Sequence, residues 1–181
     1  MSIEQALPGR LVRWITAAEP DWEAVYTEQL PRVYNFFRYR FGASVDVEDL
    51  TARTFEKAWV ARHRYRRDVA AFSTWLMTIA RNVAVDHLRA TRRHVPLEEA
   101  TAIAGGDSPE ADLIRSSDAQ RLASLLAVLP ERERELLALK YGAGLTNRAI
   151  AAATGLSESN VGTILHRAVQ GLRAQWTQGQ K

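Results

Sequence analysis

The stretch FSTWLMTIARNVAVDHLRATRR, residues 72–93, decides the fold of this 181-residue chain. It contains no Gly or Pro, and its apolar residues recur at intervals of three and four, as in an amphipathic helix. At about 100° per residue, one face carries the apolar residues Phe72, Trp75, Leu76, Ile79 and Val83. The opposite face is mostly cationic and polar, and it carries Thr74, Thr78, Arg81, Asn82, Val85, Arg89 and Arg92. We therefore predict a helix that builds a core with one side and can meet phosphates and base edges with the other. A solvated basic face is the alternative that this pattern alone leaves open.

Composition narrows the class of protein. The chain is 46% hydrophobic and 25% charged, which is typical of a globular protein, and it has no cysteine. Disulfides, thiolate metal sites and direct thiol redox sensing are thereby excluded. The sequence has neither a signal-peptide pattern nor an apolar run of about 18 residues, so we expect a cytoplasmic protein. With nothing following Lys181, we expect no built-in regulatory domain.

The sequence also lacks recognisable catalytic patterns. None of the four histidines pairs with acidic residues at metal-ligand spacing, and there is no nucleophile elbow, paired-carboxylate site or phosphate-binding glycine loop. We therefore expect no catalytic residue, no metal ion and no cofactor, and we do not expect an enzyme.

Charge divides the chain into three parts. Residues 1–93 carry 15 Lys and Arg against 11 Asp and Glu, and residues 117–181 carry 8 against 5. Residues 94–116 carry a single Arg against five acidic residues, and Pro and Gly interrupt them. We predict an all-α protein of two small helical domains, 1–93 and 117–181, joined by a flexible acidic linker. The basic domains suggest a polyanionic partner.

Helical patterns flank the 72–93 stretch on its N-terminal side. Residues 21–41 have helical apolar spacing that ends at Gly42, and Pro31 within them predicts a kink or break near Leu30. A second helix follows Asp46, which is placed as an N-cap. Residues 61–71, ARHRYRRDVAA, lack helical periodicity and are expected to form mostly loop. Arginines interleaved with an aromatic residue suit single-stranded nucleic acid, although a solvated basic loop is the alternative.

The second domain is predicted to contain a helix at about 111–129 and another that begins with Pro130 at its first position. A short helix capped by Thr146 and a last helix capped by Ser157 follow. The last two have the spacing of a helix-turn-helix, with small Ala151, a turn at Gly155 and apolar Val161. A helical hairpin of other function is the alternative. The face of the final helix that is left for a ligand carries Glu158, Ser159, Asn160, Thr163, Arg167 and Gln170.

Five pieces in this order resemble an extracytoplasmic-function (ECF, group IV) RNA polymerase sigma factor of the sigma-70 family. They are LPRVYNFFRYRFG, DVEDLTARTFEKAW, FSTWLMTIARNVAVDHLR, LPERERELLALKY and the helix-turn-helix that ends in LHRAVQGLR. The resemblance covers about residues 21–176. It implies that residues 1–93 bind core polymerase and recognise and melt the −10 promoter element, and that residues 117–181 read the −35 element as duplex.

The resemblance also implies roles for individual residues. Contact with core polymerase falls to Asp49, Phe55, Glu56 and Trp59. From the residues alone, Phe55 and Trp59 have the alternative role of core packing. Contact with the −10 DNA falls to Arg64, Tyr65, Arg66, Arg67, Thr78, Arg81, Asn82, Asp86, Arg89 and Arg92, and the loop around Tyr65 to Ala71 would hold a base pulled from the duplex. From the residues alone, Asp86 has the alternative role of holding Arg89 in place. Contact with the −35 DNA falls to Arg148, Ser157, Glu158, Ser159, Asn160, Thr163 and Arg167.

The partners expected from the resemblance are bacterial core RNA polymerase, promoter DNA and an anti-sigma factor, with no membrane insertion. Two other functions are compatible with the sequence. One is a stand-alone helix-turn-helix transcriptional regulator, which would leave residues 62–93 without a task. The other is a helical adaptor that binds only protein, for which no salt-dependent affinity for DNA is expected.

Overall fold

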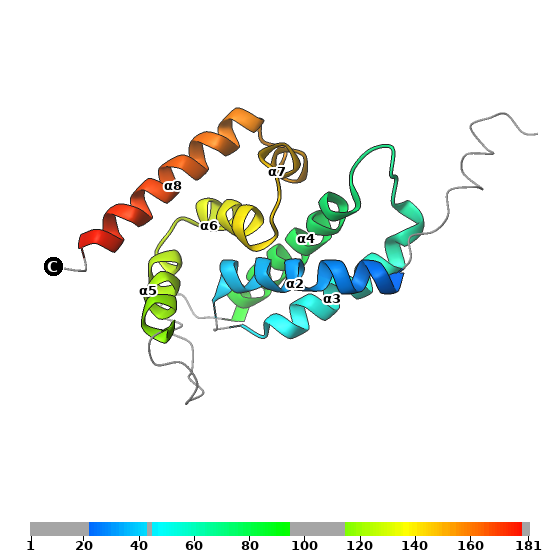
Figure 1. Cartoon of the computed structure of the whole chain (residues 1–181). Helices are drawn as coiled ribbons and strands as arrows, with labels where there is room; N and C mark the ends of the chain where they lie inside the picture. Colours follow the sequence, from blue (N-terminus) through cyan, green and yellow to red (C-terminus); the bar gives the residue numbers. More distant parts are fainter. Residues whose placement is uncertain (1–21, 43–44, 95–114, 179–181) are drawn as a thin grey trace, which may run out of the picture.

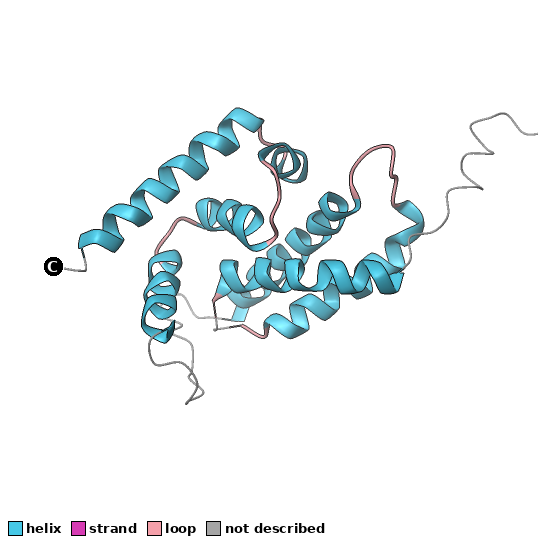
Figure 2. Ribbon diagram, viewed as in Figure 1, coloured by secondary structure: helices cyan, strands magenta, loops and turns pink. Residues whose placement is uncertain are grey.

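The computed structural model describes residues 22–42, 45–94 and 115–178, and every regular element in these ranges is helical (Figure 1, Figure 2). The elements in chain order are α2 (Trp22–Phe41), α3 (Val47–Ala61), η2 (Arg62–Arg64), α4 (Phe72–His94), α5 (Arg115–Ala127), α6 (Glu131–Leu137), η3 (Ala138–Gly142), α7 (Asn147–Thr154) and α8 (Glu158–Gln178). The predicted all-α class is confirmed. None of the helices in these ranges is long and apolar enough to cross a bilayer. Residues 1–20 and most of the predicted linker lie outside the described residues.

Helices α2, α3 and α4 form the N-terminal lobe, residues 22–94, which is built on the apolar face of α4. Leu76 and Ala80 on that face are fully buried, and Phe72, Trp75 and Ile79 pack at its edge. The opposing walls come from α2 and α3, whose fully buried side chains include Phe36, Phe37 and Leu50. Burying each large apolar side chain stabilises the fold by about 1.5–3 kcal/mol.

Helices α5 to α8 form the C-terminal lobe, residues 115–178. Its fully buried side chains include Leu136 of α6, Leu139 of η3, Ile150 of α7 and Val161 of α8. The π-type turns of η3 extend α6 by one wider turn, and the amide of Ala143 donates to the carbonyl of Ala138 at 2.9 Å. Such π segments are rare and give a helix a local bulge, here at the point where the C-terminal lobe meets α2.

The two lobes pack against each other, and one cluster of buried apolar side chains continues through both. Figure 1 shows α6 and α7 over α2 and α4, and Arg32 of α2 donates to the carbonyls of Ala143 and Gly144 at 2.8 and 3.3 Å. Gly142 lies directly against α2, where an added Cβ would stand 2.8 Å from the carbonyl oxygen of Asn35. We call this packing of the lobes the closed arrangement.

Most predicted helix ends are confirmed. The side chains of Asp46, Thr146 and Ser157 accept from the backbone amides of Asp49, Ala149 and Asn160 at 2.8, 3.1 and 3.2 Å.

Glycines close two helices as predicted. Gly42 ends α2 with φ +69°, and Gly155 ends α7 with φ +75°. Residues with a Cβ rarely adopt this left-handed conformation, so these two positions favour glycine.

Three details of the sequence prediction are wrong. Helix α2 runs through Pro31 without the predicted break, whereas a kink near Leu30 stays a prediction; Pro31 is exposed, so water can satisfy the carbonyl that it leaves unpaired. Pro130 is the N-cap of α6 rather than its first residue, since its extended ψ of 141° turns the chain into the helix. Helix α5 ends at Ala127, two residues before the predicted end, and the predicted first residues 111–114 lie outside the described ranges.

Candidate nucleic-acid interface

The helix-turn-helix predicted from the sequence is formed by α7 and α8. Gly155 provides the turn between the two helices, and Ile150 and Val161 are fully buried between them. Leu165, one turn beyond Val161, is 6% exposed and fixes α8 on the lobe. The apolar side of α8 is therefore used for packing, and its remaining side is available for a ligand.

Most of the side chains that the sequence assigned to the −35 element lie on the outer face of α8, whereas Arg148 lies on α7 and Ser157 directly precedes α8. Arg148, Ser157, Glu158, Ser159, Asn160, Thr163 and Arg167 are all exposed. The hydroxyl of Thr163 donates to the carbonyl of Ser159 at 3.0 Å, and Ser157 caps the helix. Asn160, Arg167 and Gln170 on this face have side chains that can make paired hydrogen bonds to base edges in a major groove.

The arginine-rich segment forms the short helix η2 and a turn before α4. Tyr65 packs edge-on against Phe72, with ring centroids 5.1 Å apart, and lies 5.3 Å from the ring of Trp75. Its hydroxyl donates to the carbonyl of Ala70 at 3.3 Å. The loop is therefore held on the start of α4 by an aromatic cluster, while Arg64, Arg66 and Arg67 remain exposed.

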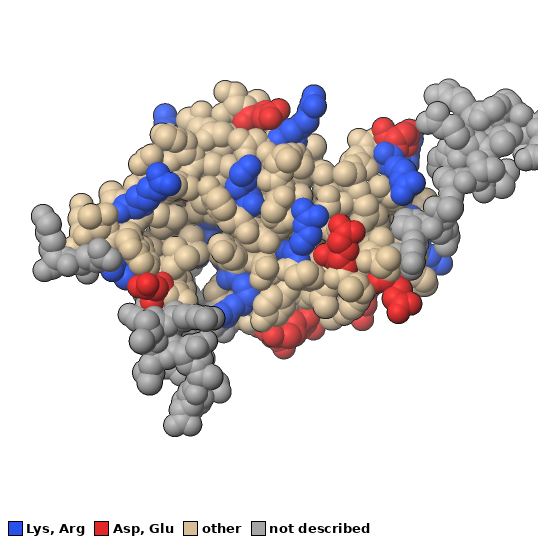
Figure 3. Space-filling view, viewed as in Figure 1, with Lys and Arg blue, Asp and Glu red and all other residues tan. Residues whose placement is uncertain are grey.

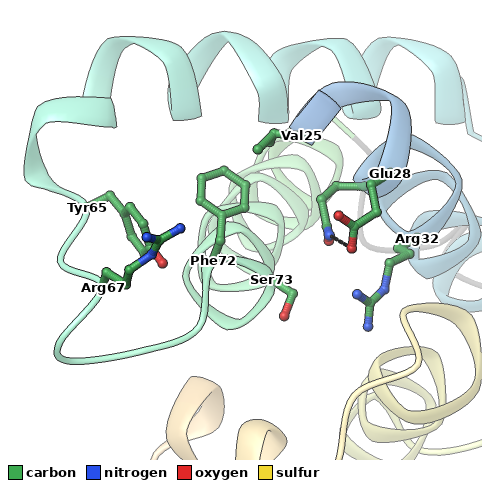
Figure 4. A pocket seen from close by; sticks show the side chains of 8 residues that line it. Val25, Glu28, Arg32, Tyr65, Arg67, Phe72 and Ser73 are labelled. Carbon is green, nitrogen blue, oxygen red and sulfur yellow. Dashed lines mark hydrogen bonds between the residues drawn. The ribbon is translucent and has the colours of Figure 1, made fainter. Parts of the chain in front are cut away.

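A pocket of about 300 Å³ opens between this loop and α2 (Figure 4). Its lining residues combine aromatic rings, cations and polar groups: Val25, Glu28, Gln29, Arg32, Tyr65, Arg67, Phe72 and Ser73. Figure 4 shows Tyr65 and Arg67 beside Phe72, with Glu28 and Arg32 of α2 on the other side of Phe72 and Ser73. Aromatic faces with nearby cations are what a single unstacked base and its phosphates require.

The residues of α4 that the sequence assigned to −10 DNA fall into two groups. Asn82, Asp86, Arg89 and Arg92 are exposed. Thr78 and Arg81 are half-buried. Thr74, which the sequence placed on the same face without assigning it to DNA, is 8% exposed, so part of the face expected to be open is covered by other elements.

Arg81 is occupied by the C-terminal lobe. Its side chain is 19% exposed, and its Nε lies 3.0 Å from the carboxylate of Glu135. A second nitrogen of the same guanidinium donates to the backbone carbonyl of Ala153 in α7.

The alternative role for Asp86, holding Arg89 in place, is wrong. The Asp86 carboxylate pairs with Lys57 of α3 at 3.0 Å. Both side chains are more than half exposed, so this pair contributes at most about 1 kcal/mol. Lys57 offered no signal in the sequence, because the contact joins two helices 29 residues apart.

The residues assigned to core polymerase lie on α3. Asp49 and Glu56 are exposed, and Asp49 forms an ion pair with Arg53 at 3.0 Å. Trp59 is 50% exposed and Arg62 lies over its ring at 4.2 Å, whereas Phe55 is 9% exposed and packs against Tyr26. Phe55 therefore contributes mainly to the core, and Asp49, Glu56 and Trp59 are available at the surface.

An ion cluster that the sequence analysis missed lies between the lobes. We call it the interlobe ion cluster, and its members are Arg40, Arg81, Arg92, Glu131 and Glu135. Arg40 donates to Glu135 at 2.6 Å and to Glu131 at 3.4 Å, and Arg92 pairs with Glu131 at 2.9 Å. Arg40 and Glu135 have only 2% and 8% of their side chains exposed.

Electrostatics favours the ionised form of Glu135. Burial acts to raise the pKa of this carboxyl, but the charges and hydrogen bonds of Arg40 and Arg81 outweigh burial and hold its pKa below the ordinary value. The interlobe ion cluster therefore stays charged at neutral pH, with two cations sharing one buried carboxylate.

Outside this cluster, on α4 of the N-terminal lobe, burial and then the charge of Arg53 lower the pKa of His87.

Basic side chains are dispersed over the visible face of the closed arrangement. Figure 3 shows Lys and Arg across both lobes, with acidic side chains between and below them. A continuous basic track is not seen on this face. The exposed arginines of the loop and of α8 thus form separate nucleic-acid candidates.

Comparison with known proteins identifies the family. Residues 25–94 match the model of Sigma-70 region 2, and residues 119–172 match that of Sigma-70 region 4. The chain is 35% identical over 134 residues to the ECF RNA polymerase sigma factor ShbA of Streptomyces griseus. The aligned residues make up 71% of this chain and 70% of ShbA. It is 28% identical over 166 residues to the sigma factor BldN of Streptomyces coelicolor, covering 90% of this chain and 63% of the length of BldN.

Solved structures agree on the fold. The sigma factor RpoE, in a complex with the anti-sigma factor NepR from Bartonella quintana, matches 87% of this chain with a TM-score of 0.73 at 22% identity. CnrH, in a complex with the cytosolic domain of CnrY, matches 92% with a TM-score of 0.59 at 24% identity. The chain belongs to the ECF RNA polymerase sigma factors of the sigma-70 family. The resemblance stated from the sequence is therefore confirmed.

Proposed function

We propose that this chain binds core RNA polymerase and directs it to promoters by reading two DNA elements with two domains. Residues 1–93 would bind the polymerase and recognise and melt the −10 element, residues 94–116 would connect the domains, and residues 117–181 would read the −35 element. The chain would contribute binding and strand separation, and the polymerase would supply the chemistry of RNA synthesis. We place this activity in the cytoplasm.

Reading of the −10 element is assigned to the Tyr65 pocket and the exposed polar face of α4. Extruding a base from the duplex costs a few kcal/mol. A base that stacks on Tyr65 and Phe72 regains about 1–3 kcal/mol, and phosphate contacts from Arg67 and Arg89 add to this. The pocket therefore offsets a large part of the cost of opening the first base pair.

Reading of the −35 element is assigned to the outer face of α8, with Asn160 and Arg167 at the base edges. Each well-formed paired hydrogen bond to a base discriminates by about 1–3 kcal/mol. Ser157, Ser159 and Thr163 at the start of the helix are placed to contact phosphate, which positions the helix in the groove.

Polymerase contact is assigned to the exposed part of α3. Trp59 is a large aromatic side chain that remains half-exposed, and such residues commonly anchor protein interfaces. Glu56, one turn before Trp59, and Asp49 near the start of α3 would meet basic side chains of the polymerase. Control by an anti-sigma factor is supported by a fold neighbour, since RpoE was solved in a complex with the anti-sigma factor NepR.

The observation that supports this proposal most is that each lobe carries its own candidate DNA reader. One lobe has an aromatic pocket with cations, and the other has a helix-turn-helix with an exposed polar face. Run-off transcription tests it. The purified chain is mixed with sigma-free bacterial core polymerase and genomic fragments from its source, and transcript starts are mapped. Discrete starts that share −35 and −10 motifs are expected. Core binding without starts would favour an adaptor, and DNA binding without core binding would favour a stand-alone regulator.

A further inference from the structure

The Tyr65 pocket contains an acidic side chain that phosphate binding does not explain. Glu28 of α2 lines this pocket together with Tyr65 and Arg67 of the loop before α4. Phosphates repel a carboxylate, so an acid at this place weakens the binding of every DNA sequence alike. A carboxylate helps a DNA reader only where it accepts a hydrogen bond from a base, since the bases are the donors that DNA offers.

The carboxylate of Glu28 is oriented by its neighbour in the chain. The side-chain amide of Gln29, a residue that is 4% exposed, donates to one carboxylate oxygen of Glu28 at 3.0 Å. Figure 4 shows this bond, with the carboxylate on the side of α2 that faces Phe72 and Ser73. The buried amide therefore holds the carboxylate at the wall of the pocket.

Within residues 22–42, 45–94 and 115–178, no cation pairs with this carboxylate. Arg32 and Arg67 line the same pocket, yet neither forms an ion pair with Glu28. Arg32 donates instead to two backbone carbonyls of the C-terminal lobe. The second carboxylate oxygen of Glu28 is therefore available to a ligand.

The chemistry of this oxygen determines which bases suit the pocket. An ionised carboxylate accepts hydrogen bonds and donates none. Cytosine, adenine and guanine each carry an exocyclic amino group that donates, whereas thymine carries a carbonyl oxygen where cytosine carries its amino group. When that carbonyl faces Glu28, two acceptors meet with no proton between them, and each loses a hydrogen bond that it makes in water.

We propose that Glu28 is a specificity-determining residue, which makes the Tyr65 pocket select an extruded base with an exocyclic amino group and reject thymine. The inference rests on the proposed function of this pocket and names the class of base that it takes. Tyr65 and Phe72 supply stacking, which every base can use because every base has a π-face. Selection among the bases then falls to the one side chain of the pocket wall that carries a negative charge.

The matched pair of bases that tests this selection is cytosine and uracil, which differ in an amino group or a carbonyl oxygen at C4 and in the proton at N3. Each is placed at the centre of a fluorescent single strand of about ten nucleotides whose other residues lack bases, and a strand without any base is the baseline. Affinity for the holoenzyme is measured by anisotropy, and the affinity of core polymerase alone is measured with the same strands.

With the unchanged chain, we expect the cytosine strand to bind about tenfold more tightly than the uracil strand, because uracil leaves the carboxylate without a donor. In Glu28→Gln the ratio should fall to about one, because the new amide can accept from cytosine or donate to uracil. The matched control is Glu23→Gln, which removes the same charge from α2 outside the pocket lining and should keep the ratio of the unchanged chain.

A ratio below about twofold in the unchanged chain, or the full ratio retained in Glu28→Gln, would overturn the role of Glu28. The latter includes tighter binding of every strand by Glu28→Gln with the ratio kept, since Glu28 would then act only by repelling phosphates. Failure of the proposed function is distinguishable, because the unchanged chain would bind all three strands equally. Failure of this inference alone would leave the cytosine and uracil strands equal to each other and both tighter than the strand without a base.

Discussion

Two acids of α6 allow a sharp test of what holds the lobes together. Glu131 and Glu135 lie one turn apart and both bind Arg40. The Glu131 side chain is 43% exposed, whereas that of Glu135 is 8% exposed and contacts a guanidinium that is 2% exposed. The two substitutions Glu131→Gln and Glu135→Gln are chemically identical and differ in the solvent around the carboxylate.

The expected magnitudes follow from that difference. Removing one partner of a buried ion pair costs about 3–5 kcal/mol, because the other charge is left without compensation. Gln retains an acceptor oxygen, so we expect Glu135→Gln to cost about 3 kcal/mol of the free energy that stabilises the closed arrangement. Exposed pairs contribute about 0–1 kcal/mol, so Glu131→Gln should cost no more than about 1 kcal/mol.

The assay is a urea titration of the chain labelled with two dyes, on Ala52→Cys in α3 and Ala174→Cys in α8, followed by loss of energy transfer. Both positions are exposed, and the sequence has no other cysteine. This signal reports the closed arrangement whether it is lost by lobe separation or by unfolding. A loss of about 3 kcal/mol shifts the equilibrium by a factor of more than 100, so Glu135→Gln is expected to lose transfer at far lower urea, or before urea is added. A Glu135→Gln variant that lies within about 1 kcal/mol of the unchanged chain, or that matches Glu131→Gln, would show that the buried carboxylate does not hold the lobes together.

Other predictions concern pH, packing and the two DNA readers. The pKa of Glu135 is lowered in the folded chain, so the stability that this carboxylate contributes is complete at pH values above its ordinary pKa of 4.5 and is lost as pH falls through the folded pKa. The urea midpoint of the unchanged chain should therefore fall on acidification, and it should fall less in Glu135→Gln. Leu76→Ala removes a fully buried side chain and should lower the free energy of unfolding by about 2–5 kcal/mol in urea denaturation, whereas a loss below about 1 kcal/mol would contradict its place in the core. Tyr65→Ala should weaken binding of a single-stranded −10 oligonucleotide to the holoenzyme by about 1–3 kcal/mol in anisotropy titrations, and an unchanged affinity would exclude base stacking there. Arg167→Ala should weaken −35 duplex binding by about 1–3 kcal/mol and relax selectivity at one base pair; a uniform loss across sequences would indicate a phosphate contact instead.

The elements that were predictable are those determined by local patterns. The 3.6-residue period identified α4, and short-range chemistry identified the caps at Asp46 and Thr146 and the turn at Gly155. The helix-turn-helix followed from spacing within a dozen residues. Pro31 shows the limit of such rules, since its effect on α2 depends on whether the unpaired carbonyl meets water.

The features that were not predictable depend on contacts between segments far apart in the chain. Arg40 and Glu135 are separated by 95 positions, and each fits its own helix as an ordinary surface charge. Their burial arises only when the lobes pack together, and no periodicity within α2 or α6 reports that event. For the same reason the face of α4 around Arg81 was expected to be free, while in the closed arrangement α7 covers it.

The central claim is that two domains read two promoter elements independently on one polymerase. It is tested most directly by footprinting the holoenzyme on a mapped promoter. The account predicts that Asn160→Ala/Arg167→Ala loses protection at −35, that Asn82→Ala/Arg89→Ala loses permanganate-reactive thymines near −10, and that both variants still bind core polymerase. Equal loss at both elements in either variant, or loss of core binding in both, would contradict this division between the two domains.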